Sequence, residues 1–392
     1  MSSTQPHLQL TRSLTLLLSA ACALAVATVY FAQPLLEAMA ASLAVPTRLI
    51  GLVVGATQAG YALGLLLIVP LGDLFDRKRL IIGQLLLSAL ALLAVGLAQA
   101  WAALLAAMGM VGLMAVVVQV MVAHAATLAT PAQQGQAVGT VTSGVVLGIL
   151  LARLVAGGGA DLVGWRGVYF AAAGLALGMA LWLWRVMPSA RPVARRQGYL
   201  ALLGSVLELY RHDRLLRQRG VLALLVFAAF SVLWSSLVLP LSVAPWRLSP
   251  AQVGLFGLAG IAGALAASRA GGLADKGLGQ RTTGLALGLL TLSWLPIGFA
   301  GQSLLALVLG VVLLDLAVQA VHVTNQSLLL AGRGEMASRL VGAYMCCYSV
   351  GSGVGAVAAS WLYGQWGWMA VCGLGAGISA GAWVYWWGMR RG

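Results

Sequence analysis

The stretch from Val311 to Ala331, VVLLDLAVQAVHVTNQSLLLA, combines an apolar, membrane-crossing length with groups that could bind protons or polar ligands. On a helix, Asp315, Gln319, His322 and Gln326 stand at i, i+4, i+7 and i+11, within about 60° of arc and over roughly 16 Å. We call this row the polar stripe. Facing lipid, it would cost several kcal/mol, so we expect it to face a hydrated central cavity. There, Asp315 could bind and release a proton as water access alternates, with His322 as a relay or substrate partner. The competing interpretations are structural: a hydrogen-bonded Asp315 that holds neighbouring helices, and a packed His322.

Similar reasoning identifies polar and aromatic side chains in other apolar runs as candidates for the same pathway. For each of them, ordinary packing is the competing interpretation. The candidates are Tyr30, Gln33, Gln58, Tyr61, Gln119, Trp234 and Tyr348.

The elements that would position these residues are membrane-spanning helices. Of the 392 residues, 61% are hydrophobic and only 8% are charged, and the mean hydropathy is +0.96, which together indicate an integral membrane protein. The apolar runs are too long for membrane strands, so we predict an all-α membrane protein with twelve transmembrane helices. The predicted spans are 13–36, 48–70, 79–99, 102–128, 136–158, 165–187, 220–243, 250–270, 282–300, 302–330, 339–361 and 367–388.

The net charge of +14 is explained by topology rather than by a nucleic-acid partner. With the N-terminus in the cytoplasm, only four of the 23 Lys and Arg residues fall on the outer half, namely Arg48, Arg153, Arg166 and Arg247. This asymmetry is typical of the positive-inside rule and predicts that both termini are cytoplasmic. The four cysteines lie in apolar runs without metal-ligand spacing, so we expect no metal site.

The chain looks like two copies of a six-helix unit. GDLFDRKR (72–79) and GGLADKGLGQR (271–281) share a pattern, and Gly164–Trp165 and Gly367–Trp368 open the sixth and twelfth spans. We therefore predict two pseudo-symmetric six-helix bundles, 1–187 and 220–392, joined by a cytoplasmic linker, 188–219. Residues 200–219 could be an amphipathic helix at the membrane surface or part of a solvated linker. Glycines spaced for close helix contacts occur at 51, 55, 60, 64, 135, 139, 144, 148, 351, 353 and 355.

Twelve spans, a basic central loop and G-x-L-x-D-[RK] after the second and eighth spans resemble the major facilitator superfamily, and residues 57–80 are similar to its bacterial efflux-type branch. The resemblance implies alternating access, with the first, fourth, seventh and tenth spans lining the cavity. It also implies a conformational latch between the halves, which we assign to Gly72, Asp76, Arg77, Gly271, Asp275 and Lys276. Arg79 stands where the family usually has glycine, which could change the latch geometry. Topogenic charge is the competing interpretation.

Arg153 lies inside the fifth span, where an unpaired cation is costly unless it reaches the membrane surface. If the first and fifth spans are neighbours, as in the family, Glu37 and Arg153 could form an outer-side ion pair. Snorkelling of Arg153 is the alternative.

We therefore predict a secondary active transporter of the bacterial inner membrane, most simply a proton-coupled exporter of a small, fairly apolar compound. The alternatives are a uniporter or proton symporter for a sugar or amino acid derivative and, in another class, a non-transporting membrane receptor. The expected partners are a small-molecule substrate, protons and the lipid bilayer, for a monomer that binds no nucleic acid. We expect no enzyme activity, no catalytic residues and no cofactor, because the chain has neither a Walker motif nor a nucleophile with its base.

Overall fold

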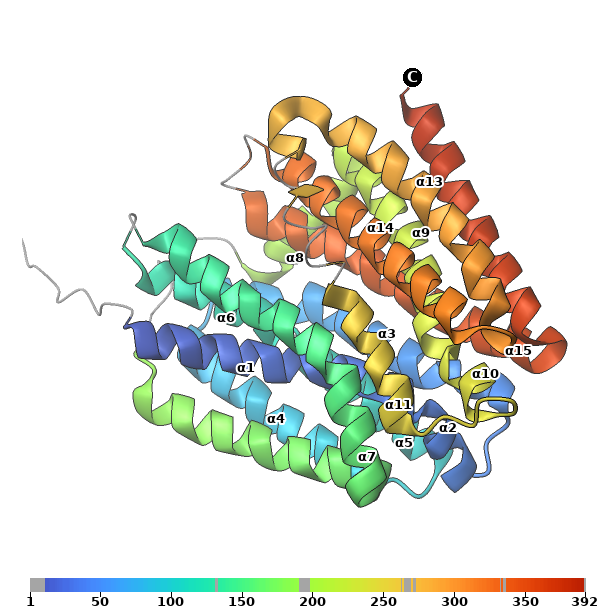
Figure 1. The fold of residues 1–392 in the computed structure, drawn as a ribbon. Helices are drawn as coiled ribbons and strands as arrows, with labels where there is room; N and C mark the ends of the chain where they lie inside the picture. Colours follow the sequence, from blue (N-terminus) through green and yellow to red (C-terminus); the bar gives the residue numbers. More distant parts are fainter. Residues whose placement is uncertain are drawn as a thin grey trace, which may run out of the picture.

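The computed structural model describes residues 11–130, 133–189, 198–261, 263, 269–270, 273–331, 333 and 336–390, with only the backbone of 200, 202, 206, 274, 275, 337 and 338. Every regular element in these ranges is helical (Figure 1). The elements are α1 (Arg12–Tyr30), α2 (Ala32–Ser42), η1 (Thr47–Leu49), α3 (Gly51–Leu67), η2 (Val69–Asp73), α4 (Arg77–Leu97), α5 (Trp101–Ala115), α6 (Val117–Leu128), α7 (Gln134–Val186), α8 (Tyr199–His212), α9 (Arg214–Ser236), α10 (Val238–Ser242), α11 (Pro250–Leu255), η3 (Phe256–Ala259), η4 (Ala274–Leu278), α13 (Gly279–Gly298), η5 (Phe299–Gly301), α14 (Leu304–Leu330) and α15 (Ala337–Met389).

The described part of the chain contains nine helices long and apolar enough to cross a membrane. Two of them, α7 and α15, have 53 residues each, about twice what one bilayer crossing needs. Each is broken once, at Gly164 with φ 71° and at Gly367 with φ 72°, a conformation that glycine adopts without strain. Each therefore holds two spans, and the shorter apolar helix 250–259 begins the remaining one. The predicted all-helical fold with twelve spans is confirmed.

Two prolines bend equivalent spans in the two halves of the chain. Helix α1 ends at Tyr30 and α2 begins at Ala32, while α9 ends at Ser236 and α10 begins at Val238. Pro34 and Pro240 have no N–H to donate to the carbonyls four residues earlier, those of Tyr30 and Ser236, so each helix breaks there. The first and seventh spans thus share one local cause for the same bend.

Glycines bring equivalent helix pairs together within each half. A Cβ on Gly144 of α7 would lie 2.0 Å from the carbonyl oxygen of Ser19 in α1, and one on Gly351 of α15 would lie 2.1 Å from that of Leu224 in α9. Only glycine permits such close approach. The prediction of close contacts is wrong for Gly135 and Gly139, whose added Cβ would meet nothing within 4 Å.

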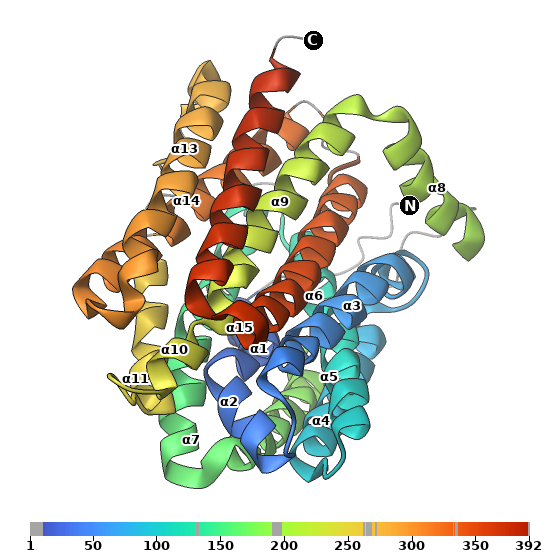
Figure 2. The same ribbon diagram turned by 90° about the vertical axis from the view of Figure 1, so that its right-hand side faces the viewer.

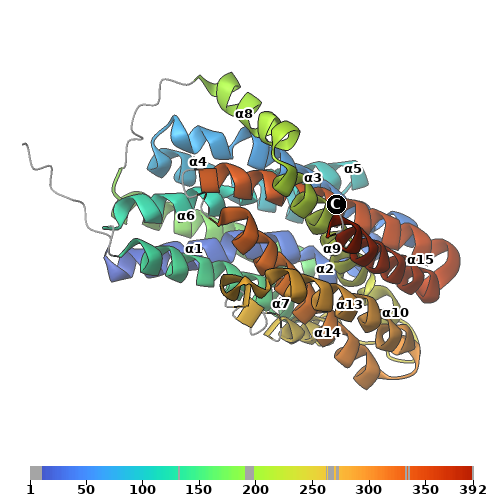
Figure 3. The same cartoon turned by 90° about the horizontal axis from the view of Figure 1, so that it is seen from above.

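Helices α1–α7 and α9–α15 occupy two different regions of the molecule, which meet at one end and diverge at the other (Figure 1). Figure 2 shows α8 and the C-terminal end of α15 at one side, which we call the terminal side, and α2, α10 and α11 at the opposite side, which we call the far side. Seen from above, α8 lies beside α3 and α4 at the edge of the molecule (Figure 3).

The far side is closed by contacts between the two halves of the chain. Ser249 Oγ donates to Asp161 Oδ2 at 2.7 Å, and the backbone N–H of Gly51 donates to Ser360 Oγ at 3.1 Å. A Cβ on Gly51 would lie 2.1 Å from the carbonyl oxygen of Ala356, so the backbones of α3 and α15 touch there.

The segment that joins the halves contains helix α8, and this helix is tied to both of them. Tyr199 Oη donates to the carbonyl of Leu67 in α3 at 2.7 Å, and Tyr210 Oη donates to the carbonyl of Ala343 in α15. Of the predicted range 200–219, residues up to His212 form α8, whereas residues 214–219 are the first turns of α9, so the predicted end of the helix and the predicted start of the seventh span are wrong. Helix α8 bridges the two halves.

Candidate functional site

A cavity of about 520 Å³ lies between the two halves. Most of its wall is aliphatic, from Val26 and Val29 of α1 to Val145 and Ile149 of α7. The predicted pathway residues that line it are Tyr30, Gln58, Tyr61, Gln119, Asp315, Gln319, His322, Gln326 and Tyr348. The structure thus places the whole polar stripe in the cavity wall. Of the predicted set, only Gln33 and Trp234 do not line the cavity, and both support residues that do.

Asp315 is almost completely removed from the surface, with 3% of its area exposed. Its Oδ1 accepts a hydrogen bond of 3.0 Å from Trp234 Nε1 in α9. Two glycines pack closely beside it: a Cβ on Gly260 would lie 2.5 Å from Leu150 Cδ2 and 3.7 Å from Asp315 Oδ2, and one on Gly263 would lie 3.1 Å from the Asp315 carbonyl oxygen. Asp315 also lines the cavity, so a small group bound there would lie beside it.

Arg153 of α7 also points into this cavity, and only 2% of its area is exposed. Its Nε donates to Gln33 Oε1 at 2.6 Å. Its guanidinium carbon lies 3.6 Å from the ring centroid of Trp234, at the distance of a cation–π contact.

The predicted ion pair between Arg153 and Glu37 is not formed in this structure. Glu37 is exposed, whereas the acceptor of Arg153 is Gln33, one turn earlier on the same helix. The two helices are in contact as predicted, but the Arg153 side chain lines the cavity instead of reaching Glu37.

Trp234 touches both charged side chains of the cavity. The face of its indole ring receives the Arg153 guanidinium, and its N–H binds the Asp315 carboxylate. A cation and an anion are thus held beside one aromatic ring in a wall that is otherwise mainly apolar. Charges interact strongly in such a low-dielectric setting.

Hydrogen bonds between polar groups connect the halves along the cavity. Tyr30 Oη and Tyr348 Oη lie 2.5 Å apart, joining α1 to α15, and Ser349 Oγ donates to Gln58 Oε1 at 2.8 Å. His322 Nδ1 lies 3.1 Å from Tyr344 Oη, within the second half.

Sequence reasoning missed a second buried arginine. Arg219 belongs to the predicted inner-side cations, yet only 1% of its area is exposed and its Nη1 donates to Asn325 Oδ1 at 3.1 Å. Arg219 precedes the predicted start of the seventh span by one residue, and Asn325 lies in the polar stretch of the tenth. These two positions are the sequence features that could have indicated a buried pair. Phe227 and Phe230, also missed, are cavity aromatics without a polar pattern.

The loop after the second span binds its own half of the chain. Asp76 caps α4, where its Oδ1 accepts from the N–H of Lys78 at 2.9 Å. Arg77 donates through Nε to the carbonyl of Gly72 at 3.0 Å and through Nη1 to that of Ala123 in α6 at 3.2 Å. In the second half, Gly271 and the side chain of Asp275 lie outside the described residues, and Lys276 is exposed.

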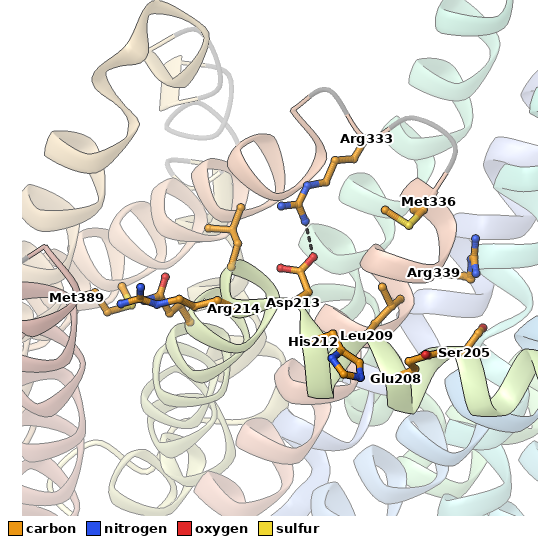
Figure 4. Close-up of a pocket in the computed structure, with 12 residues that line it drawn as sticks. Ser205, Glu208, Leu209, His212, Asp213, Arg214, Arg333, Met336, Arg339 and Met389 are labelled. Carbon is orange, nitrogen blue, oxygen red and sulfur yellow. Dashed lines mark hydrogen bonds and ion pairs between the residues drawn. The ribbon is translucent and has the colours of Figure 1, made fainter. Parts of the chain in front are cut away.

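A larger pocket of about 1030 Å³ lies on the terminal side, beside α8 and the start of α9 (Figure 4). Asp213 caps α9 through the N–H of Leu216 at 2.9 Å and forms an ion pair with Arg333. Ionic side chains such as Glu208, Arg214 and Arg339 line this pocket, in contrast to the mainly apolar central cavity.

Comparisons with known proteins agree with this architecture. The profile of the Major Facilitator Superfamily matches residues 16–332. The chain is 45% identical over 386 residues to YgaY of Escherichia coli O157:H7, an uncharacterized transporter, covering 98% of this chain and 97% of the relative. It is also 26% identical over 254 residues to YnfM of Escherichia coli K12, an inner membrane transport protein, covering 64% of this chain and 60% of the relative.

Among solved structures, a bacterial homologue of the human lysosomal transporter Spinster, in an inward-facing and occupied conformation, has a similar fold. The TM-score is 0.80 at 14% identity, with 97% of this chain and 96% of that chain covered. The chain therefore belongs to the Major Facilitator Superfamily and is a multi-pass membrane transporter, not an enzyme.

Proposed function

We propose that this transporter exports a small, fairly apolar compound across the bacterial inner membrane in exchange for protons. The observation that carries the proposal is Asp315, a carboxylate with 3% exposure in the wall of the cavity between the halves. We expect both termini to be cytoplasmic, because the Lys and Arg residues concentrate on that side.

Asp315 is suited to couple proton and substrate because an ionised carboxylate is costly to keep in an apolar wall. A proton, or a substrate group, can offset that cost when water reaches the cavity from one side or the other. Proton and substrate would then occupy the site alternately, which is the requirement for exchange.

The mainly aliphatic lining, with Val26, Val145 and Ile149 among its members, favours a substrate with a large apolar part. The remaining predicted pathway residues would position its polar groups, and His322 would assist as a relay or a substrate contact. This disfavours a compound with a large net charge.

Alternating access requires that the far-side contacts separate while the terminal side closes. In the closed terminal side, we propose that the loops at 72–77 and 271–276 contact the opposite half as latches. The bonds of Arg77 to Gly72 and Ala123 within the first half fit the other state of the cycle, in which the latch is released.

The test uses the full chain in proteoliposomes that contain a pH-sensitive dye, with an imposed pH gradient and a panel of apolar test compounds. We expect compound-dependent proton flux in the parent and a loss of at least about tenfold, or 1.4 kcal/mol, in Asp315→Asn. Glu37→Gln removes an exposed carboxylate outside the cavity, in the other half of the chain, and should keep the flux. Equal flux in the parent and in Asp315→Asn would show that Asp315 is not the coupling group.

A further inference from the structure

The cavity presents two opposite charges that do not pair directly with each other. Arg153 and Asp315 both line it, and the ion pairs within 4.0 Å in the described part of the chain lie elsewhere. Trp234 contacts both, with its ring face 3.6 Å from the Arg153 guanidinium carbon and its N–H 3.0 Å from Asp315 Oδ1. The two charges are therefore displayed beside each other, spaced by one indole ring.

Arg153 has donor capacity that the protein does not use. A guanidinium has five N–H donors. Its Nε–H is bound by Gln33, but the buried Nη2 has no partner among the described residues. A buried N–H group without an acceptor is costly, and a carboxylate is the group whose two oxygens match the guanidinium fork.

Asp315 has complementary capacity for a cation. Oδ1 accepts from the indole N–H, whereas Oδ2 has no hydrogen-bond donor among the described residues, and Asp315 lines the cavity. An ammonium group has the size and charge to bind there in place of a proton. Proton and ammonium then exclude each other at this carboxylate.

The rest of the wall accepts an apolar body. Val145, Ile149, Phe227 and Phe230 lie in the same 520 Å³ cavity, which is within the usual range for a small-molecule site. One ligand can satisfy all three features only if it has a carboxylate, an ammonium group and an apolar side chain.

We propose that the substrate is a small zwitterion of the α-amino acid type, whose carboxylate binds Arg153 and whose ammonium group binds Asp315. This deepens the proposed function and rests on it. The site and ligand together are neutral when Asp315 is ionised, and a proton on Asp315 would leave Arg153 and the ammonium group without that counter-charge. Substrate binding thus expels the proton, as exchange requires.

The test measures binding to the purified full chain with two matched series, one built on a benzyl and one on an isobutyl side chain. The benzyl series is L-phenylalanine, 3-phenylpropanoate, 2-phenylethylamine and 3-phenylpropan-1-ol, and the isobutyl series contains L-leucine and the corresponding acid, amine and alcohol. Ligand-induced melting-temperature shifts give each dissociation constant. In at least one series, the zwitterion should bind at least tenfold more tightly than each of its three analogues.

Variants then assign each end of the ligand. Asp315→Asn removes the proposed partner of the ammonium group, so it should reduce the preference for the zwitterion over the acid to less than about threefold. Arg153→Gln removes the proposed partner of the carboxylate, so it should reduce the preference for the zwitterion over the amine to less than about threefold. Glu37→Gln and Arg247→Gln alter exposed charges outside the cavity and should keep the parental order. If a cavity variant does not fold, the order of the four dissociation constants measured on the parent still tests the proposal.

The proposal is overturned if an acid, amine or alcohol binds the parent as tightly as its zwitterion in both series, or if neither zwitterion binds. The two proposals fail separately. A neutral or cationic compound that drives proton flux dependent on Asp315 would leave the exchange mechanism standing and overturn the zwitterion. Tight zwitterion binding without such flux would support the zwitterion and overturn the exchange mechanism.

Discussion

The contact of Gly51 with α15 predicts that one methyl group can change the conformational equilibrium of this transporter. In the structure, a Cβ at position 51 would lie 2.1 Å from the carbonyl oxygen of Ala356 and 2.5 Å from Ser360 Oγ. Two of the three nearest atoms belong to the backbone of Ala356, which cannot rotate away. Gly51→Ala therefore forces α3 and α15 apart at the far side.

The size of the effect follows from the usual cost of overpacking, about 1–3 kcal/mol. The clash exists only while the far side is closed, so the cost acts on one state of the cycle. A difference of this size changes the ratio of far-side-closed to far-side-open molecules by roughly 5- to 150-fold.

Two other glycines provide matched controls. Gly144→Ala creates a clash of the same kind, 2.0 Å from the Ser19 carbonyl oxygen, but within the first half. It should lower the melting temperature in both states and change their ratio little. Gly377→Ala, whose Cβ would meet nothing within 4 Å, should do neither.

The assay is the distance distribution between spin labels at Leu162 and Val243, two exposed far-side positions in different halves. The native cysteines are first replaced by alanine. Gly51→Ala should increase the long-distance population relative to the parent and to Gly377→Ala. An unchanged distribution in a folded Gly51→Ala protein, or an equal shift in Gly144→Ala, would refute the reasoning.

Two further predictions concern the buried arginine and the topology. Asn325→Leu removes the acceptor of Arg219 Nη1 and should lower the melting temperature more than the double replacement Arg219→Leu/Asn325→Leu, because only the single variant leaves a buried guanidinium without that acceptor. The result is read from melting curves in detergent, and a double variant less stable than Asn325→Leu alone would contradict it. Alkaline phosphatase fused after Gly198 should be inactive, because we place this segment in the cytoplasm, and strong activity would show the opposite orientation.

Much of the fold could be predicted because the bilayer imposes local rules. A span must be long, apolar and internally hydrogen-bonded, so the runs of the sequence predict the helices without knowledge of their neighbours. The breaks at Gly164 and Gly367 and the bends at Pro34 and Pro240 are also local, since each follows from one residue's own backbone geometry.

The polar stripe shows how far this reasoning extends toward the site. Helical periodicity alone places Asp315, Gln319, His322 and Gln326 on one face, and the cost of exposing them to lipid turns that face inward. The structure places all four in the cavity wall. Helical periodicity does not predict which atoms these side chains contact there.

What only the tertiary structure decided is the pairing of side chains from distant segments. Arg153 and Gln33 are 120 residues apart, and Trp234 and Asp315 are 81 apart. Their contacts depend on how the packed helices are rotated and tilted. A small change in either would bring a different residue of the same helix into contact. For that reason Gln33, not Glu37, holds Arg153, and one tryptophan lies between the two charges. The sequence by itself determined the spans, their order and the inward-facing row, because each depends on a helix and the lipid alone.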